Sequence, residues 1–369
     1  MKVPFNDLNL QYQGIKDEID NVISDVIEKS AFVRGPYVDE FEINFAKLFQ
    51  TDYCVSCGNG TDAIYIALRA LNIKQGDEVI VPSHSWISTS QTVTQAGGKV
   101  VFCDTDKDDY TLDPKFLKDK LSNKTVGIIP VHLFGQPANM EAIMEFSRKH
   151  NLWVIEDCAQ AHLASYKDQL VGTFGNMATY SFYPGKNLGA FGDAGAIVTN
   201  DENLSQTAAM LARHGGLIKG EHRLEGMNSR LDGIQAAILN VKLKYLNDWT
   251  IKRQKIAERY LKNLEKSEML NLPIVKEDRR HVWHLFVIKT YLRDELKKYL
   301  SNKGIDTVIN YPVSLPFLPA YGYLNHKPSD FPISFKNQSE ILSLPIFPDM
   351  TFDQVDYVCE QINQFFRNP

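Results

Sequence analysis

The sequence predicts a three-layer α/β domain on a mostly parallel sheet, followed by a smaller C-terminal α+β domain. Between about residue 50 and residue 200, short apolar runs alternate with segments of helical periodicity, an order typical of a parallel sheet covered by helices on both faces. A long helical pattern over 229–265 follows, and the pattern changes after it. Because 369 residues suffice for two domains, we expect a large domain over 1–245 and a small one over 246–369.

The expected elements begin with two helices. Ile15, Ile19 and Val26 recur at helical spacing, and Phe41 and Phe45 do so after a Gly-Pro turn. The alternating region then predicts strands over 53–56, 78–81, 99–102, 126–129, 152–155, 178–182 and 194–199, with helices over 61–71, 86–96, 113–121 and 138–150. Beyond the long helix we expect a strand over 284–289 and helices over 292–302 and 351–366.

Composition argues against several classes of protein. The net charge of −5 and the lack of a long basic run argue against a nucleic-acid partner. No apolar run reaches about 18 residues and the amino terminus lacks the apolar core of a secretory signal, so we expect no membrane segment and a cytoplasmic location. Five cysteines, an odd number, fit a reducing compartment. Cys54 and Cys57 lack a second pair at zinc-ribbon spacing, so we expect packing rather than a metal site.

A lysine and an aspartate at predicted strand ends indicate a specific chemistry. Lys186 follows a strand, and Gly185 and Gly189 let the backbone pass close to a bound group. Asp157 ends the run LWVIED, at the carboxyl end of a predicted parallel strand, where α/β sheets bind ligands. Pyridoxal phosphate needs this pair, an amine for its aldehyde and a carboxylate for its ring nitrogen. A lone loop lysine would be a solvated surface residue. The prediction of a pyridoxal phosphate site therefore depends on finding Lys186 together with Asp157.

The sequence also offers a phosphate site and an aromatic platform. The strand over 53–56 runs into a Gly-Asn-Gly turn, and a helix begins near Thr61, so backbone N–H groups and a hydroxyl converge on one anion. Ser181 supplies a second hydroxyl near the lysine. Trp86, after the strand over 78–81, is placed to stack on a cofactor ring. Each feature alone is more often an ordinary capped turn or a core aromatic, but four such parts at four strand ends favour a cofactor site.

Six motifs occur in order along the chain. They are NGTDA (59–63), VPSHSW (81–86), VIEDCAQAH (154–162), SFYPGKNLGAFGDAGA (181–196), RHGG (213–216) and NSRLDGIQAAIL (228–239). Together they resemble the DegT/DnrJ/EryC1/StrS family of pyridoxal-phosphate-dependent aminotransferases, which act on nucleotide-linked keto sugars. The resemblance covers nearly the whole chain. It implies the aspartate aminotransferase fold, also called fold type I, and a role in lipopolysaccharide O-antigen or related surface glycan biosynthesis.

The resemblance also implies a role for each matching residue. Lys186 corresponds to the catalytic lysine, which links to the cofactor as a Schiff base and carries the proton to and from the substrate carbon. Asp157 pairs with the ring nitrogen, Gln160 contacts the phenolic oxygen, and Trp86 occupies the stacking position. The phosphate site comprises Gly60, Thr61, Asp62 and Ser181.

One further residue carries an expectation about assembly. Asn228 matches an asparagine that reaches the phosphate bound by the neighbouring subunit, so the resemblance implies a homodimer with shared active sites. From its own position, Asn228 marks the start of the helix over 229–265, and a helix N-terminus suits an anion.

The sugar substrate is read from pattern similarity alone. KNLGAFGDAG (186–195) is similar to relatives that aminate C3 of the sugar rather than C4. The expected substrates are a dTDP-3-keto-6-deoxyhexose and a UDP-2-acetamido-3-keto sugar, with NGTDA favouring the second and L-glutamate as the amino donor. A sugar carboxylate would require a cation, for which Arg230 is the candidate.

The chain departs from many relatives near the substrate. Where they read H-Y-P-x-P-x-H, this chain reads NYPVSLPFLPAYGY (310–323), with Asn310 and Pro316 at the two histidine positions. Tyr311 remains as a candidate sugar contact, and packing between prolines would explain it equally well.

Four other functions compete with a C3 aminotransferase. A C4 aminotransferase of the same family stays open. A sugar dehydratase of this fold carries a histidine in place of Lys186, and a non-catalytic member would lack the lysine, the aspartate or the phosphate loop. A nicotinamide dehydrogenase would need G-x-G-x-x-G, whereas 57–62 reads CGNGTD.

Overall fold

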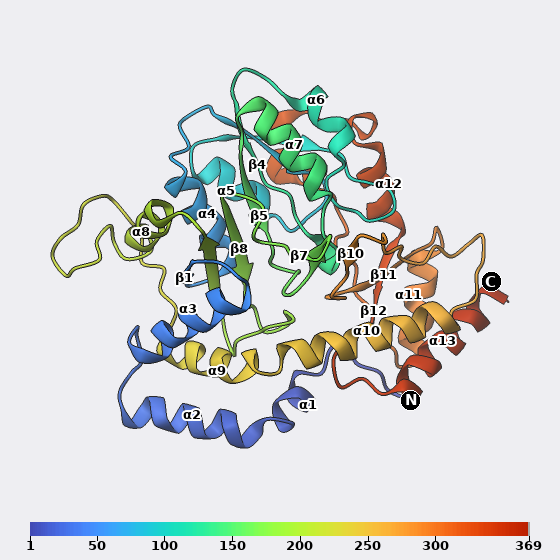
Figure 1. Cartoon of the computed structure of the whole chain (residues 1–369). Helices are drawn as coiled ribbons and strands as arrows, with labels where there is room; N and C mark the ends of the chain where they lie inside the picture. The colour runs from blue at the N-terminus through green and yellow to red at the C-terminus, as the bar shows by residue number, and fades with distance from the viewer. Residues whose placement is uncertain (368–369) are drawn as a thin grey trace.

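A seven-stranded sheet forms the centre of the computed structural model, which describes residues 1–367 (Figure 1). The strand order is β1-β9-β8-β5-β4-β2-β3. Strands β8, β5, β4, β2 and β3 pair in parallel, whereas β9 is antiparallel to both of its neighbours. The mostly parallel sheet is therefore confirmed. The strands are β1 Tyr53–Cys57, β2 Glu78–Pro82, β3 Lys99–Cys103, β4 Thr125–Ile128, β5 Trp153–Asp157, β8 Met177–Ser181 and β9 Gly195–Thr199.

Helices cover both faces of this sheet, which explains why its strands read as continuous apolar runs. In β2, Val79 and Val81 join the apolar cluster under α4, α5 and α8, whereas Ile80 joins the cluster under α7. Side chains alternate between the faces of a strand, so both faces need apolar residues. The helices are α1 Leu8–Gln13, α2 Lys16–Glu28, α3 Pro36–Leu48, α4 Gly60–Ala70, α5 Ser88–Gln95, α6 Leu117–Lys120, α7 Met140–His150 and α8 Glu202–Leu211.

The expected single helix over 229–265 is wrong. The structure has two helices, α9 Gly233–Leu243 and α10 Leu246–Asn263, and the N-cap of α9 is Asp232. Asn228 precedes them and forms an antiparallel bridge with Arg213. The backbone of 227–229 is held extended, since Met227 N donates to Leu211 O and Ser229 N to Ala212 O. Asn228 is thus not at a helix N-terminus, and the helix-dipole argument for it fails.

The C-terminal part of the chain combines a small sheet with helices. Strand β11 Phe286–Lys289 pairs antiparallel with β12 Ile341–Leu344. Helices α10, α11 Arg293–Asn302 and α13 Phe352–Arg367 share an apolar cluster that also includes Val3. The sequence did not predict α8, β12, α12 Pro332–Glu340, or the short strands β6 Ser165–Tyr166, β7 Gln169–Leu170 and β10 Arg279–Arg280.

A domain boundary at residue 245 remains a proposal. The interruption between α9 and α10 falls there. Packing in two apolar clusters, however, crosses this boundary. Val3 packs in the C-terminal cluster, while Leu315, Tyr321 and Phe331 pack in a cluster of the large sheet.

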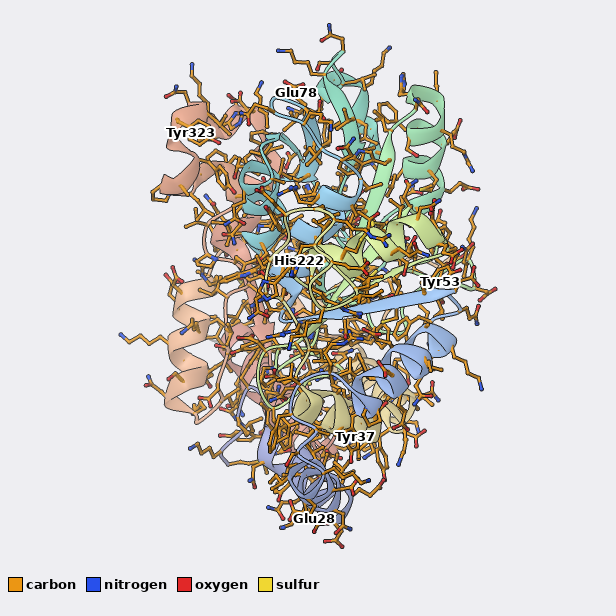
Figure 2. The ribbon with its side chains drawn as sticks, turned by 90° about the vertical axis from the view of Figure 1, so that its left-hand side faces the viewer. Glu28, Tyr37, Tyr53, Glu78, His222 and Tyr323 are labelled. Atoms are coloured by element: carbon orange, nitrogen blue, oxygen red, sulfur yellow. The ribbon has the colours of Figure 1, made fainter. Side chains whose placement is uncertain are left out.

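The long loop between α8 and α9 stands away from the body of the molecule. It lies at the left of Figure 1, and in Figure 2, where that side faces the viewer, His222 marks it in front of the sheet. Leu217 and Ile218 in this loop are exposed. Among residues 1–367, no helix combines the length and the apolar character needed to cross a bilayer.

Candidate active site

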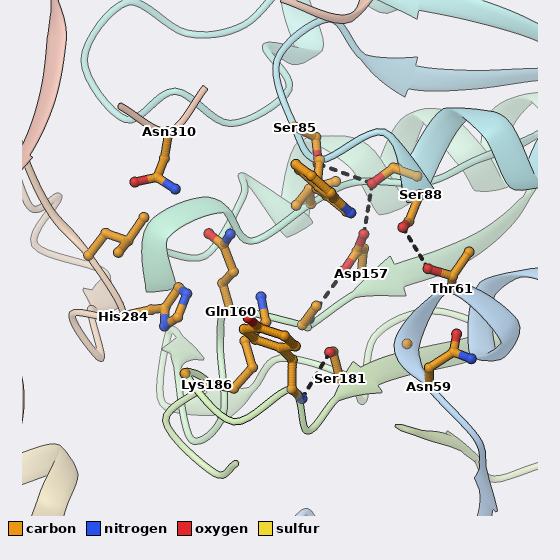
Figure 3. Close-up of a pocket in the computed structure, with 18 of the residues that line it drawn as sticks. Asn59, Thr61, Ser85, Ser88, Asp157, Gln160, Ser181, Lys186, His284 and Asn310 are labelled. Carbon is orange, nitrogen blue, oxygen red and sulfur yellow. Dashed lines mark hydrogen bonds between the residues drawn. The ribbon is translucent and has the colours of Figure 1, made fainter. Parts of the chain in front are cut away.

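A cavity of about 860 Å³ lies where β5 and β8 end and α4 begins (Figure 3). Parallel strands direct their carboxyl ends to one edge, which is where such sheets bind ligands. Most of the predicted site residues line this cavity. They are Gly60, Thr61, Asp62, Trp86, Asp157, Gln160, Ser181, Lys186 and Tyr311.

Lys186 carries a buried amine whose protonated form is disfavoured. Burial lowers the pKa of Lys186 to about 8, and the nearby Asp157 carboxylate opposes part of that shift. Burial raises the pKa of Asp157, while the hydrogen bonds from Ala159 and Thr89 and the attraction of Lys186 act in the other direction. A buried amine that readily gives up its proton is suited to nucleophilic attack on a carbonyl group.

The Asp157 carboxylate is held at both oxygens. Ala159 N donates to Oδ1 at 3.1 Å, and Thr89 Oγ1 donates to Oδ2 at 2.9 Å. Thr89 is itself in contact with Ser85, at 3.0 Å between the two hydroxyl oxygens. These contacts fix the direction in which the carboxylate faces the cavity (Figure 3). Sequence reasoning did not identify Thr89, which lies only three residues after Trp86.

The amino end of α4 approaches the end of β8 very closely. A Cβ atom on Gly60 would lie 2.6 Å from Ser181 Cβ, so only glycine allows this approach. Asn59 caps the helix, its Oδ1 accepting from Asp62 N at 2.8 Å. The first N–H groups of a helix have no partner within it, and here the hydroxyls of Thr61 and Ser181 lie beside them. Thr61 Oγ1 also contacts Ser88 Oγ at 2.7 Å.

The side chain of Asp62 binds another residue of the protein and is not free to contact a phosphate. Its Oδ2 accepts from Ser229 Oγ at 2.7 Å, and Gly58 N donates to the same hydroxyl at 2.9 Å. Ser229 therefore fastens the 227–229 segment to the Gly-Asn-Gly turn. Sequence reasoning missed Ser229, although its neighbour Asn228 is among the predicted residues.

Gln160, Tyr311 and Trp86 form the opposite wall. Gln160 Oε1 accepts from Phe134 N at 2.6 Å, and its Nε2 donates to Tyr311 Oη at 3.0 Å. Tyr311 N donates to His84 Nε2 at 3.2 Å, which holds the loop in place. The rings of Trp86 and Tyr311 lie 5.4 Å apart, and Trp86 remains 58% exposed. Trp86 thus has a face free to cover a planar ligand.

Two predicted residues do not line the cavity in this single chain. Asn228 and Arg230 are both exposed. Two others that sequence reasoning missed, Arg253 and His284, do line it. The signal for them is weak, because an arginine in a helix and a histidine before a strand occur in any α/β protein.

A buried trio lies behind the site. Atoms of His132, Glu156 and Cys158 lie within 4.8 Å of one another. Glu156 accepts from the backbone N–H groups of 172, 174 and 175. His132 Nδ1 accepts from Ala138 N, so its Nε2 carries the proton and donates to Glu156. With both partners already satisfied, this trio supports the strand that carries Asp157.

The cavity fits pyridoxal phosphate. It offers a buried amine with a lowered pKa, an oriented carboxylate, an exposed aromatic face and a helix N-terminus between two hydroxyls. Lys186, Asp157, Trp86 and the Thr61–Ser181 cradle would hold the aldehyde, ring nitrogen, ring face and phosphate respectively.

The comparisons with known proteins agree with this interpretation. The sequence model of the DegT/DnrJ/EryC1/StrS aminotransferase family matches residues 13–363. A dTDP-3-amino-3,6-dideoxy-alpha-D-galactopyranose transaminase from Aneurinibacillus thermoaerophilus is 42% identical over 98% of this chain and 99% of its own. A pleiotropic regulatory protein from Geobacillus stearothermophilus is also 42% identical, over 100% of both chains.

Solved structures give the same result. DesV from S. venezuelae, in complex with a ketimine intermediate, has a TM-score of 0.98 at 39% identity, covering 100% of this chain and 99% of that one. NtdA from Bacillus subtilis, with bound cofactor PMP, has a TM-score of 0.89 at 31% identity, covering 95% of this chain and 82% of that one. The predicted fold, family and cofactor are confirmed.

Proposed function

This chain belongs to the DegT/DnrJ/EryC1/StrS aminotransferase family, and from that premise we propose that it moves the amino group of L-glutamate to C3 of a nucleotide-linked 3-keto sugar. It is a pyridoxal-phosphate-dependent sugar aminotransferase of glycan biosynthesis. The observation that carries the proposal is the buried Lys186 amine facing the oriented Asp157 carboxylate in one cavity. A purely regulatory role is not favoured, since the lysine, the aspartate and the phosphate cradle are all present.

Each residue contributes a defined chemical task. When bound, pyridoxal phosphate supplies a carbonyl for amines and a ring that delocalises negative charge. Lys186 would take the proton from the donor carbon and return one to the substrate, because its neutral amine is accessible near pH 8. Asp157, held by Thr89 and Ala159, would keep the ring nitrogen protonated. Trp86 would cover the ring and exclude water from one face.

Two observations support C3 over C4. The segment 186–195 is similar to C3 enzymes, and relatives that share 42% and 36% identity are named for dTDP-linked and UDP-linked sugars modified at C3. Incubating the enzyme and L-glutamate with 3-keto and 4-keto nucleotide sugars, each with dTDP and UDP, tests this by mass spectrometry. An amino sugar is expected from a 3-keto substrate only, and product from the 4-keto panel alone would contradict the assignment.

We also propose a cytoplasmic location and a part in O-antigen or related surface glycan synthesis. The five cysteines are free, and Cys54 alone among them is not fully buried. Free thiols are typical of a reducing compartment.

We further propose that the enzyme works as a homodimer with shared active sites. Apolar side chains that a monomer would expose to water support this. They are Phe32, Val33, Phe191, Leu217 and Ile218. Asn228 is exposed at the base of the projecting loop, where a partner's phosphate cradle could receive it.

Asn228→Ala is expected to weaken cofactor retention about tenfold and to make that retention depend on protein concentration. A ligand that binds only the assembled state stabilises assembly by mass action. Analytical ultracentrifugation of apoprotein and holoprotein, with the cofactor followed by its absorbance, measures both effects. A holoenzyme that is active as a monomer would rule out the shared site and the role given to Asn228.

The pKa of Lys186 predicts a pH profile for cofactor capture. Burial lowers this pKa to about 8, so the fraction of neutral amine rises as the pH passes through 8 and levels off above it. The rate at which apoprotein captures pyridoxal phosphate should follow the same curve, measured by stopped-flow absorbance. A rate that keeps rising toward pH 10.5, the ordinary lysine value, would mean that the amine is solvated.

A further inference from the structure

Arg253 is a buried cation in the wall of the active-site cavity. It lies on α10, its side chain is 3% exposed, and it lines the same cavity as Lys186. Within residues 1–367 it forms no ion pair with an Asp or Glu. Asp349 attracts it from a distance and is itself paired with Lys252 at 2.9 Å. Burying an unbalanced charge is costly, so this position calls for an explanation.

The hydrogen bonds of Arg253 leave one edge of its guanidinium free. Nη1 donates to the carbonyl oxygens of Trp283 at 3.1 Å and Ile346 at 3.0 Å, with a longer contact to His284 O at 3.4 Å. Nε has no partner although it is buried. Nη2 forms no hydrogen bond with the described residues. The Nε–Nη2 edge is one of the edges that pair with both oxygens of a carboxylate.

The charge of the cavity points to the ligand for this edge. Among the described residues that line the cavity, Lys186 is the one lysine and Arg253 is the one arginine. Lys186 is assigned to the cofactor. Burial lowers the pKa of His284 well below 6.5, and both cations are close enough to lower that pKa further, so His284 stays neutral. Its Nδ1 lies 3.3 Å from Asn187 Oδ1. Arg253 is therefore the remaining described cation for an anionic substrate group that enters this end of the cavity.

We propose that Arg253 binds a carboxylate of the amino donor, L-glutamate, and of its product 2-oxoglutarate. This rests on the proposed function, since a sugar aminotransferase must hold a dicarboxylate and a nucleotide sugar in turn at one lysine. The Nη1 contacts fix the guanidinium to the backbone of 283–284 and 346, so that the free edge is presented in one orientation. A cation held in one position favours amino donors whose carboxylate reaches it while their amino group lies at Lys186.

Glutarate, an unreactive dicarboxylate, tests the site directly. Calorimetric titration into holoenzyme should detect binding by the wild type. Arg253→Gln keeps an amide donor for the carbonyl groups and removes the charge, and its glutarate affinity should fall about 10- to 100-fold, as expected for a lost charged hydrogen bond. Lys255→Gln removes an exposed charge from the same helix, one that forms no ion pair with the described residues, and should leave the affinity unchanged. Neutral glutaramide should not bind any of the three proteins.

The two half-reactions separate this inference from the proposed function. Loaded with pyridoxamine phosphate, Arg253→Gln should lose less in the amination of the keto sugar than in the reaction with glutamate, whose KM should rise. A folded Arg253→Gln enzyme with wild-type glutarate affinity overturns the inference and leaves the sugar reaction standing. A wild type that binds glutarate through Arg253 but aminates no keto sugar contradicts the proposed function instead.

Arg253 also braces the backbone, so a folding defect must be distinguished from a lost ligand. Circular dichroism and a melting curve accompany each variant. Arg253→Lys retains the charge without the planar fork and serves if Arg253→Gln does not fold. About tenfold weaker glutarate binding by Arg253→Lys supports the assignment, and unchanged affinity contradicts it.

Discussion

Lys186→Ala is expected to abolish turnover, since the loss of general acid–base catalysis alone costs about 10²- to 10⁴-fold. The variant removes the amine that we propose to link to the cofactor and to move the substrate proton. Arg253, the other Lys or Arg in the described cavity lining, would not form such a link. Borohydride reduction followed by peptide mass spectrometry measures the linkage without reference to activity. The wild type should carry the reduced cofactor on Lys186, and the variant should carry it nowhere.

An exposed lysine provides the control. Lys167 is 52% exposed and pairs with Glu141 on the surface, so Lys167→Ala should retain both the label and full activity. Reduced cofactor attached to Lys186→Ala, or to a lysine other than Lys186 in the wild type, would contradict the role proposed for Lys186.

Asp157→Asn should lower activity by about 10²- to 10⁴-fold while the fold is preserved. The ring nitrogen would lose its counter-charge and the cofactor much of its capacity to delocalise negative charge. The carbonyl oxygen of the introduced amide could still accept from Ala159 N, and the Thr89 hydroxyl can rotate to suit the amide. A melting temperature near that of the wild type, together with the kinetic loss, is the expected pair of results.

A second measurement separates an electrostatic role from a structural one. The Asp157 charge raises the pKa of Lys186 against the effect of burial. Removing that charge should shift the midpoint of cofactor capture to lower pH. Near-wild-type rates with an unshifted profile would mean that another group holds the ring nitrogen.

The two variants also differ in what a rescue could restore. In Lys186→Ala, a small amine added to the solution can diffuse into the space that the lysine side chain occupied and act as a base there. No added ion reproduces the effect of Asp157, since its carboxylate acts from a position fixed by two hydrogen bonds. Partial rescue by methylamine is therefore expected for Lys186→Ala and absent for Asp157→Asn.

The sequence by itself determined the sheet and the central pair of residues. Strands that are buried on both faces read as apolar runs, and the helices between them keep their own periodicity, so both signals are local. Lys186 and Asp157 stand at strand ends, and parallel strands bring their carboxyl ends to one edge whatever the later folding of the loops. The motifs that match the family are likewise read without coordinates.

Only the tertiary structure decided the rest of the site. Ser229 reaches Gly58 across 171 positions of the chain, and the extended backbone at Asn228 depends on pairing with 211–213. Arg253 became a cavity residue because α10 packs against the backbone at 283 and 346. Such contacts are stabilised by burial and by partners far along the chain, and neither can be predicted from a local sequence pattern. The helix over 229–265 illustrates the same limit, since its periodicity continues through the break that packing imposes at 244–245.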